Sequence, residues 1–428
     1  MSLCRRLAAL LPRRRLSAAS PTTTVLVVGA GSTGLALAQG LKKAGIPCIV
    51  VERDESIDAR PRDWNMGLHW GADSLRALIP SSLWARLQSV QVDPSTPTAP
   101  VDAIQFLNGQ TGELMSSIPA RNFHRLRRRK LRFLLAEGLD IRFAHPITNI
   151  TYSRNGKLAT AHFANHPSIT ASLIVGTDGA RSATRSLLLG PNAAIRSLPY
   201  CATFIHARYP RDKALFLRSF HPLFLAAINP AGYFAFLGLQ DVPDPEDPES
   251  WTFFFYISWA SSLEEQQETA RWSKAQRLAQ GKQLATHFAD PWKSAYEWLD
   301  DDQAEVWYNP LTDFDPSTES HRWNNHNCRV TLAGDAAHPM TYQRGQGLNH
   351  AVTDAGKLFG AIQEFVSGRK TRAEAVGAYE EEMIARGGEE VRMSATNTEM
   401  VHDWQKVLQS PVIRNGLTRV GEVKRRAG

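Results

Sequence analysis

Three glycines, Gly29, Gly31 and Gly34, have the spacing with the clearest chemical meaning in this sequence. In a Gly-x-Gly-x-x-Gly turn, the first glycine permits a tight turn, the second lets the backbone approach a pyrophosphate, and the third lets a helix meet a strand. The motif lies between an apolar run, Thr24–Val28, and a helical stretch, Leu35–Lys43. A diphosphate bound there would meet the free N–H groups and the dipole of a helix N-terminus. The spacing therefore predicts a dinucleotide site.

An acidic residue supports this interpretation. Glu52 ends a second predicted strand, Ile46–Glu52, about 20 residues after the glycines, where an acid is expected to bind the ribose hydroxyls of adenosine. Arg53, its neighbour, is expected to contact the same nucleotide. The glycine spacing alone is a weak signal, and a glycine turn in an unrelated α/β protein is the alternative. Strands on both sides of the motif and Glu52 behind it favour a βαβ nucleotide-binding unit.

Two further motifs each follow a predicted buried strand. The strand Leu173–Gly176 is followed by Thr-Asp-Gly-Ala-Arg-Ser-Ala-Thr-Arg at positions 177–185. The strand Arg329–Gly334 is followed by Asp335 and the stretch Ala-Ala-His-Pro, and then by a glycine-rich turn at 344–349. A carboxylate at a strand's carboxyl end is suited to hold polyol hydroxyls. A helix beginning near Gly347 would stabilise negative charge on a bound ring.

Together the three motifs resemble those of the para-hydroxybenzoate hydroxylase family of flavoprotein monooxygenases, from Thr22 to about Asn397. The resemblance implies that the first motif binds the ADP half of FAD. It also implies that Asp178 and Gly179 serve both FAD and NAD(P)H, and that Asp335 binds the ribityl chain. The turn and helix start beside the flavin pyrimidine ring are matched by Gly345, Gly347, Leu348 and Asn349.

The resemblance extends to a basic run and has one departure. Arg128 matches the family arginine that contacts the flavin nucleotide, with Arg127 or Arg129 as alternatives and a solvated helix face as the ordinary explanation of such a run. The family usually has a proline in the turn after the Gly-Asp-Ala-Ala-His stretch, where this chain has Tyr342. That change bears on the geometry of oxygen transfer rather than on FAD binding. His338 is expected to have a structural role beside the cofactor, not that of a base.

Residues 200–260 are predicted to form strands with many aromatic side chains. One face of such a sheet would line an apolar pocket over the flavin, although ordinary sheet core is the better interpretation for most of them. The stretch 62–70 resembles the region that passes near the flavin in fungal members. No residue is named as catalytic. The aromatic candidates are Phe216, Phe220, Phe224, Tyr233, Phe236, Trp251, Phe253 and Phe255.

These elements predict an α/β fold in which a Rossmann-like FAD-binding domain is interleaved with a β-sheet substrate domain and followed by C-terminal helices. The FAD-binding domain is expected at 22–190 and 326–428, with 60–125 contributing near the active site. The substrate domain is expected at 191–325. Everything after Gly347 is predicted helical, with a break at Gly387 and Gly388.

The activity that the resemblance implies starts with reduction of FAD by NADPH or NADH. Reduced flavin then reacts with O2 to give a C4a-hydroperoxide, which delivers oxygen to a small aromatic, polyketide or alkaloid-like substrate. Hydroxylation, epoxidation and a Baeyer–Villiger-like outcome all stay open, because function depends on the site rather than the fold. Alternatives are a flavin-dependent halogenase, although its Trp-x-Trp-x-Ile-Pro stretch is absent, and a non-catalytic flavin-binding redox sensor. An NAD-linked dehydrogenase would leave the second and third motifs unexplained.

Composition narrows the class of protein further. The 428 residues are 43% hydrophobic and 21% charged, as in a soluble globular protein. We expect a monomer or a homodimer. Residues 1–20 are basic and rich in Ser and Ala, which predicts a mitochondrial transit peptide or a basic tail on a cytoplasmic protein. The basic run 125–132 lacks interleaved aromatics, so no nucleic acid partner is expected. Dispersed cysteines without a CxxC predict no metal site. The apolar stretch 223–239 is too interrupted for a transmembrane segment.

Overall fold

The described part of the chain begins with the predicted βαβ unit. In the computed structural model, which describes residues 22–409, β1 (Thr22–Val28), α1 (Ser32–Lys43) and β2 (Cys48–Val51) follow one another, and β1 and β2 are parallel. On its other edge β1 pairs in parallel with β10 (Ile169–Gly176), and β10 pairs in parallel with β16 (Val330–Leu332). The predicted leader, residues 1–20, lies outside the described residues.

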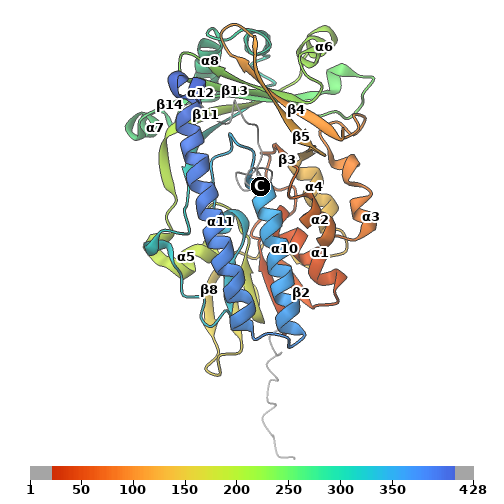
Figure 1. Ribbon diagram of the computed structural model, residues 1–428, viewed down its shortest axis with the longest axis vertical. Coiled ribbons are helices and arrows are strands. Elements are labelled where there is room, and N and C mark those ends of the chain that lie inside the picture. Colours follow the sequence, from red (N-terminus) through yellow and green to blue (C-terminus); the bar gives the residue numbers. More distant parts are fainter. Residues whose placement is uncertain (1–21, 410–428) are drawn as a thin grey trace, which may run out of the picture.

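The first sheet brings the ends of the motif-bearing strands to one edge. Its order is β7-β2-β1-β10-β9-β8, with β16 beside β10. Because β1, β10 and β16 are parallel, their carboxyl ends open on the same side, which is where ligands bind in open α/β sheets. Helix α1 packs against α10 (Gly347–Val366), and α10 packs against α11 (Arg372–Val401), so that the two long helices run side by side in Figure 1. The remaining strands of this sheet are β7 (Ile141–Arg142), β8 (Ile147–Tyr152) and β9 (Ala159–Phe163).

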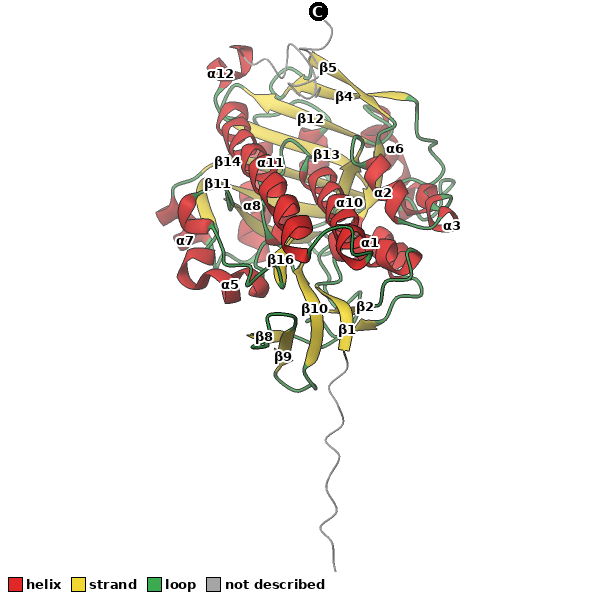
Figure 2. Ribbon diagram, turned by 60° about the horizontal axis from the view of Figure 1, so that its bottom comes forward, coloured by secondary structure: helices red, strands yellow, loops and turns green. Residues whose placement is uncertain are grey.

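A second sheet lies across the end of the molecule away from β8 and β9 (Figures 1 and 2). Its order is β15-β11-β14-β13-β12-β4-β5, and its pairs are antiparallel except for the parallel pair of β12 and β4. Its strands are β4 (Val101–Asn108), β5 (Leu114–Arg121), β11 (Arg196–Ala207), β12 (Phe224–Asn229), β13 (Tyr233–Asp241), β14 (Thr252–Ala260) and β15 (Glu305–Asp313). Residues 101–121, early in the chain, therefore lie in the same sheet as residues 196–313.

Two shorter elements connect the sheets. β3 (Asn65–Leu68) and β6 (His124–Arg127) form an antiparallel ribbon, and α4 (Arg128–Ala136) follows β6 directly. The remaining α-helices of the described residues are α2 (Ala72–Leu78), α3 (Ser81–Trp84), α5 (Ala183–Leu189), α6 (Arg211–Ser219), α7 (Leu263–Thr269), α8 (Lys274–Ala285), α9 (Trp292–Glu297) and α12 (Trp404–Gln409).

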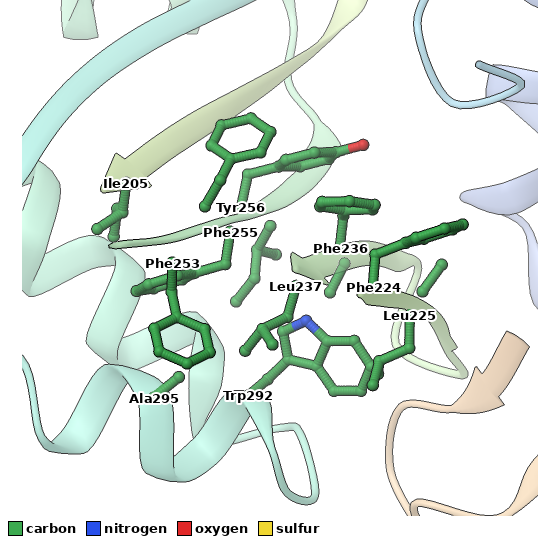
Figure 3. Close-up of a cluster of buried hydrophobic side chains, with 14 of the residues drawn as sticks. Ile205, Phe224, Leu225, Phe236, Leu237, Phe253, Phe255, Tyr256, Trp292 and Ala295 are labelled. Carbon is green, nitrogen blue, oxygen red and sulfur yellow. The ribbon is translucent and has the colours of Figure 1, made fainter. Parts of the chain in front are cut away.

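The two faces of the second sheet differ: helices pack on the outer face, and the inner face borders a cavity. On its outer face Phe255 packs edge-on against Tyr296 of α9, with ring centroids 5.1 Å apart. Figure 3 shows Phe253, Phe255 and Trp292 on this side of the sheet and Tyr256, Phe236 and Phe224 on the other. The second group faces the first sheet. The strand period of two therefore separates a packed outer face from an inner face that is available to line a site.

The predicted helix break at Gly387 and Gly388 is wrong, because α11 is continuous through both glycines. In the described residues the C-terminal helices are interrupted instead between α10 and α11, and again between α11 and α12. A Cβ on Gly387 would lie 2.7 Å from Cδ2 of His338, and one on Gly388 would lie 2.6 Å from Oδ1 of Asp315. These glycines permit close approach of the helix to its neighbours, so they mark packing rather than a boundary.

This explanation predicts opposite effects for two alanine substitutions in α11. Gly387→Ala is expected to destabilise the protein by roughly 1–3 kcal/mol, because the His338 ring is fully buried and has nowhere to move. Gly377→Ala, whose Cβ would meet nothing within 4 Å, is expected to stabilise the protein by up to about 1 kcal/mol. Urea denaturation of both variants measures the difference. Equal midpoints for the two variants would contradict the close-packing explanation.

Candidate functional site

A cavity of about 780 Å³ extends from the carboxyl edge of the first sheet to the inner face of the second. Residues from all three sequence motifs line it. Of the predicted site residues, the wall contains Gly29, Gly31, Glu52, Arg53, Arg128, Asp178, Gly179, Asp335, Gly345, Gly347 and Leu348. Gly34 and Asn349 are not part of this wall. Their contacts, described below, are with neighbouring segments of the protein.

The three glycines of the first motif have different surroundings. Gly29 has a φ of 112°, and a Cβ on it would lie 2.6 Å from the carbonyl oxygen of Thr177. Gly34 lies under the turn, where a Cβ would come within 2.2 Å of the Gly29 carbonyl oxygen. Around Gly31 the nearest atom to such a Cβ is 3.8 Å away. Gly29 and Gly34 therefore allow the turn to pack, and Gly31 leaves space on the cavity side.

Glu52 holds the glycine-rich turn in place. Its Oε2 accepts a hydrogen bond from the backbone N–H of Ala30 at 2.8 Å, and its Oε1 accepts one from the N–H of Asp54 at 3.1 Å. Arg132 donates from Nε to the carbonyl oxygen of Ala30 at 2.9 Å. Arg132 also lines the cavity and was not predicted from the sequence. Its position on α4, one helical turn after Arg128, places it on the same face of the helix and could have indicated this role.

The second motif forms the start of α5. Asp178 accepts from the Ser182 hydroxyl at 2.5 Å and from the Thr184 N–H at 3.0 Å, so both carboxylate oxygens are engaged by the chain itself. Gly179, with a φ of 82°, has open space around it. Arg185 is buried, lies 4.5 Å over the Phe314 ring, and donates to backbone carbonyl oxygens including that of Ala336 at 2.9 Å. It thereby connects the second motif to the third.

The third motif presents a carboxylate and a helix N-terminus to the cavity. Asp335 lines the cavity. Desolvation by the surrounding protein raises the pKa of its carboxyl group, and nearby His338 and Arg128 oppose this shift. A Cβ on Gly345 or Gly347 would meet nothing within 4 Å. The wall at the start of α10 is therefore open to a ligand.

Asn349 positions a neighbouring segment. Its Oδ1 accepts from the backbone N–H groups of His69 and Gly71, at 2.9 and 3.1 Å, and its Nδ2 donates to the Gly67 carbonyl oxygen at 3.2 Å. Asn349 therefore fixes the 67–71 segment to α10. That segment follows Trp64 and Asn65, which line the cavity together with Gly67 and His69.

The three candidate arginines of the basic run have different environments. Arg128 lines the cavity with its guanidinium 4.4 Å over the Trp64 ring, and burial lowers its pKa to about 10. Arg127 is ion-paired with Asp63 at 2.9 Å and with Asp241. Arg129 donates to the carbonyl oxygen of Pro61 at 2.9 Å. Of these three, Arg128 is the one that belongs to the cavity wall.

His338 and Tyr342 have different surroundings: His338 is buried behind the cavity wall, and Tyr342 is part of the wall. The His338 ring is fully buried behind the wall, with Nε2 2.6 Å from Oδ2 of Asp354, as expected for a structural residue. Tyr342 lines the cavity and packs edge-on against Phe204 and Tyr256, each at 5.3 Å between centroids. The residue in place of the family proline therefore adds an aromatic surface to the cavity.

The inner face of the second sheet supplies most of the aromatic side chains of the wall. Two of the predicted aromatics, Phe224 and Phe236, belong to it, whereas the other six predicted aromatics do not. The aromatic wall residues from this sheet that were not predicted are Phe106, Phe204, Phe234, Phe254, Tyr256, Trp307 and Tyr308.

The residues of this cavity fit an FAD. Space beside Gly31 at the N-terminus of α1 suits a diphosphate, and Glu52 stands at the end of β2 beside it. Asp335 offers a carboxylate for hydroxyl groups, and the open start of α10 beside Gly347 suits a ring that carries negative charge. The arrangement defines a class of protein: a dinucleotide-binding α/β protein whose cofactor cavity continues into an aromatic chamber.

The comparisons with known proteins agree with this class. The FAD binding domain family matches residues 22–192 and 253–394. The chain is 38% identical to the FAD-dependent monooxygenase cctM of Talaromyces islandicus, over 92% of this chain and 96% of that protein. It is 36% identical to the FAD-dependent monooxygenase phnB of Penicillium herquei, over 93% and 95%. The solved structure of Klebsiella pneumoniae HpxO with FAD and uric acid has a similar fold, with a TM-score of 0.71, 19% identity and 94% coverage of both chains.

This chain therefore belongs to the FAD-dependent, aromatic-hydroxylase-like monooxygenase family. The family resemblance and the α/β fold class inferred from the sequence are confirmed. Within residues 22–409, none of the helices has both the length and the apolar character that crossing a bilayer requires. The same residues contain no cluster of three or more His, Cys, Asp or Glu side chains arranged to hold a metal ion.

Proposed function

We propose that this protein is an FAD-dependent monooxygenase that uses NADPH or NADH and O2 to hydroxylate or epoxidise a small aromatic or polyketide-like substrate. One observation carries the proposal: a single cavity joins the three nucleotide-type motifs to a chamber of aromatic side chains. The family membership and the names of its relatives support it. A simple nucleotide-binding protein has no need of the second half of this cavity.

The wall residues divide into two groups by chemistry. The start of α1 and Gly31 would hold the FAD diphosphate, with Glu52 and Arg53 toward the adenosine ribose and Arg128 toward the nucleotide. Asp335 would hold the ribityl hydroxyls, and Gly345, Gly347 and Leu348 would border the ring. The chemistry that FAD supplies when bound is acceptance of hydride from NAD(P)H and activation of O2.

The protein's own contribution is placement and exclusion of water. The rings of Phe236 and Tyr256 stack at 5.6 Å, and Tyr342 packs against Tyr256, which gives the chamber apolar walls. Burial raises the pKa of Tyr256 and Tyr342 well above its usual range, so both phenols stay neutral at physiological pH. Such a chamber aligns a flat substrate and keeps water from the reacting atoms.

The test uses the full-length protein. We expect the purified protein to be yellow and to release FAD on denaturation, and a screen of phenols, naphthols and polyketides to identify compounds that stimulate NADPH or NADH oxidation. With ¹⁸O2, the product should gain one labelled oxygen. A folded protein that refuses added FAD would contradict the proposal. FAD binding with no substrate-stimulated turnover across the screen would instead favour a redox sensor.

A further inference from the structure

Arg125 places a cation in the aromatic part of the cavity. It lies on β6, lines the cavity, and has its guanidinium carbon 4.6 Å from the Phe224 ring centroid and 4.8 Å from that of Phe236. Figure 3 shows these two rings on the inner face of the second sheet, next to Tyr256. Arg125 therefore lies against the chamber, whereas the Arg128 guanidinium covers Trp64.

The hydrogen bonding of this guanidinium is incomplete. Its Nη2 donates to Oδ1 of Asn65, but its Nε is buried without a partner. Among the described residues no carboxylate forms an ion pair with Arg125, whereas Arg127, two positions along the strand, pairs with both Asp63 and Asp241. A buried charge normally has a counter-charge, because leaving it uncompensated is costly.

Arg125 nevertheless stays charged at neutral pH. Burial lowers its pKa to about 9, and nearby Tyr256 opposes the shift. Two aromatic faces compensate part of the desolvation through cation–π contact. His69, also in the wall, adds no competing charge, since burial lowers its pKa to about 4. The chamber wall therefore carries a positive charge with unused donor capacity, and no carboxylate within residues 22–409 is paired with it.

We propose that Arg125 is a specificity-determining residue that binds an anionic oxygen, a phenolate, enolate or carboxylate, on the aromatic substrate. The inference rests on the proposed function and names the substrate class within it. An anion at this position gains a charge-assisted hydrogen bond in a site sheltered from water. Holding a phenol as its anion also keeps its ring electron-rich, which transfer of an electrophilic oxygen requires.

The experiment measures binding of matched pairs of probes to the FAD-loaded protein by calorimetry. One pair is 2-naphthoate and 2-naphthamide. The other is 4-cyanophenol, at a pH where it is ionised, and 4-methoxybenzonitrile. In the wild-type protein, at least one anionic probe should bind roughly 10-fold or more tightly than its neutral partner. Which pair shows the preference distinguishes a phenolate-type substrate from a carboxylate.

Variants assign the preference to one side chain. Arg125→Gln should reduce the ratio to near one while neutral probes bind as before, and Arg125→Lys should retain part of the preference. Arg121→Gln removes the same charge from an exposed position on β5 and should leave the ratio unchanged.

Equal binding of both members of each pair by the wild-type protein would overturn the inference, even if Arg125→Gln did not fold. A preference that survives in Arg125→Gln, or a selective loss of FAD from that variant, would also overturn it. Failure of the proposed function is distinguishable, because it would appear in the wild-type protein as absent FAD or absent stimulated turnover.

Discussion

Gly34→Ala is expected to lose both its bound FAD and roughly 3 kcal/mol or more of folding stability. The added Cβ would lie 2.2 Å from the Gly29 carbonyl oxygen and 2.4 Å from Oγ1 of Thr177. The first obstacle is backbone in the turn itself, and Thr177 Oγ1 already hydrogen-bonds the carbonyl oxygens of Val28 and Gly29 at 3.0 Å. No side chain can rotate away to relieve the contact, so the turn or α1 must move.

Two other glycine variants make this result specific. Gly360→Ala, on α10 with nothing within 4 Å of the added Cβ, should be neutral or stabilising by up to about 1 kcal/mol. Gly31→Ala should fold normally, since its Cβ has 3.8 Å of clearance, but should bind FAD more weakly because the methyl occupies the diphosphate side of the turn. Urea midpoints and the ratio of visible to ultraviolet absorbance measure the two effects. Gly34→Ala with a midpoint equal to that of Gly360→Ala would contradict the argument.

The half of the cavity that the three motifs line was predictable because the residues of each motif are close together in sequence. A buried strand, a glycine turn and a helix start fix Gly29, Gly31 and Asp335 within a few residues, and parallel pairing then brings the motifs to one edge. Asn349 shows the limit of that reasoning. Its position in the motif is clear, but its contacts with residues 67–71 depend on the packing of α10.

The chamber could not be predicted in the same way. All six residues of β12 are buried. Helices cover one face of the second sheet, and packed aromatic rings line the cavity on its other face. Alternation of polar and apolar residues, the usual guide to the inner face, is therefore missing. Arg125 was equally hidden within a basic run, since its partners Phe224 and Phe236 are about a hundred residues away in sequence. The helix break predicted at Gly387 and Gly388 was wrong for a related reason, because the neighbours of these glycines belong to other parts of the chain.

Asp354→Asn is expected to cost roughly 3–5 kcal/mol of stability at neutral pH, as when one member of a buried ion pair is removed. Asp354 is fully buried. Its Oδ2 is 2.6 Å from Nε2 of His338 and accepts from the Gly334 N–H at 2.7 Å, and its Oδ1 accepts from Arg386 at 2.6 Å. The substitution leaves Arg386 without this buried partner. It also weakens the hold on Gly334, the residue before Asp335.

The pH dependence gives this prediction a distinct signature. His338 and Arg386 outweigh burial and lower the pKa of Asp354 to about 2, below the value of about 3.9 expected for an unfolded aspartate. A lowered carboxyl pKa contributes stability above the unfolded value, and that stability is lost as the pH falls toward 2. The contribution is roughly 2–3 kcal/mol at neutral pH. The raised pKa of His338 acts at the other end, since its stabilisation is present below about pH 6.5 and is lost as the pH rises through the folded value.

The stability difference between wild type and Asp354→Asn should therefore be largest near pH 5–6, where both contributions are present, and should narrow toward low pH. Urea denaturation at several pH values measures it. Glu382→Gln is the matched control, because Glu382 pairs with the same Arg386 at 2.9 Å but is 38% exposed, so its loss should cost at most about 1 kcal/mol. A constant offset between wild type and Asp354→Asn at every pH would show that packing, rather than the Asp354 charge, holds α10 and α11 behind the cavity.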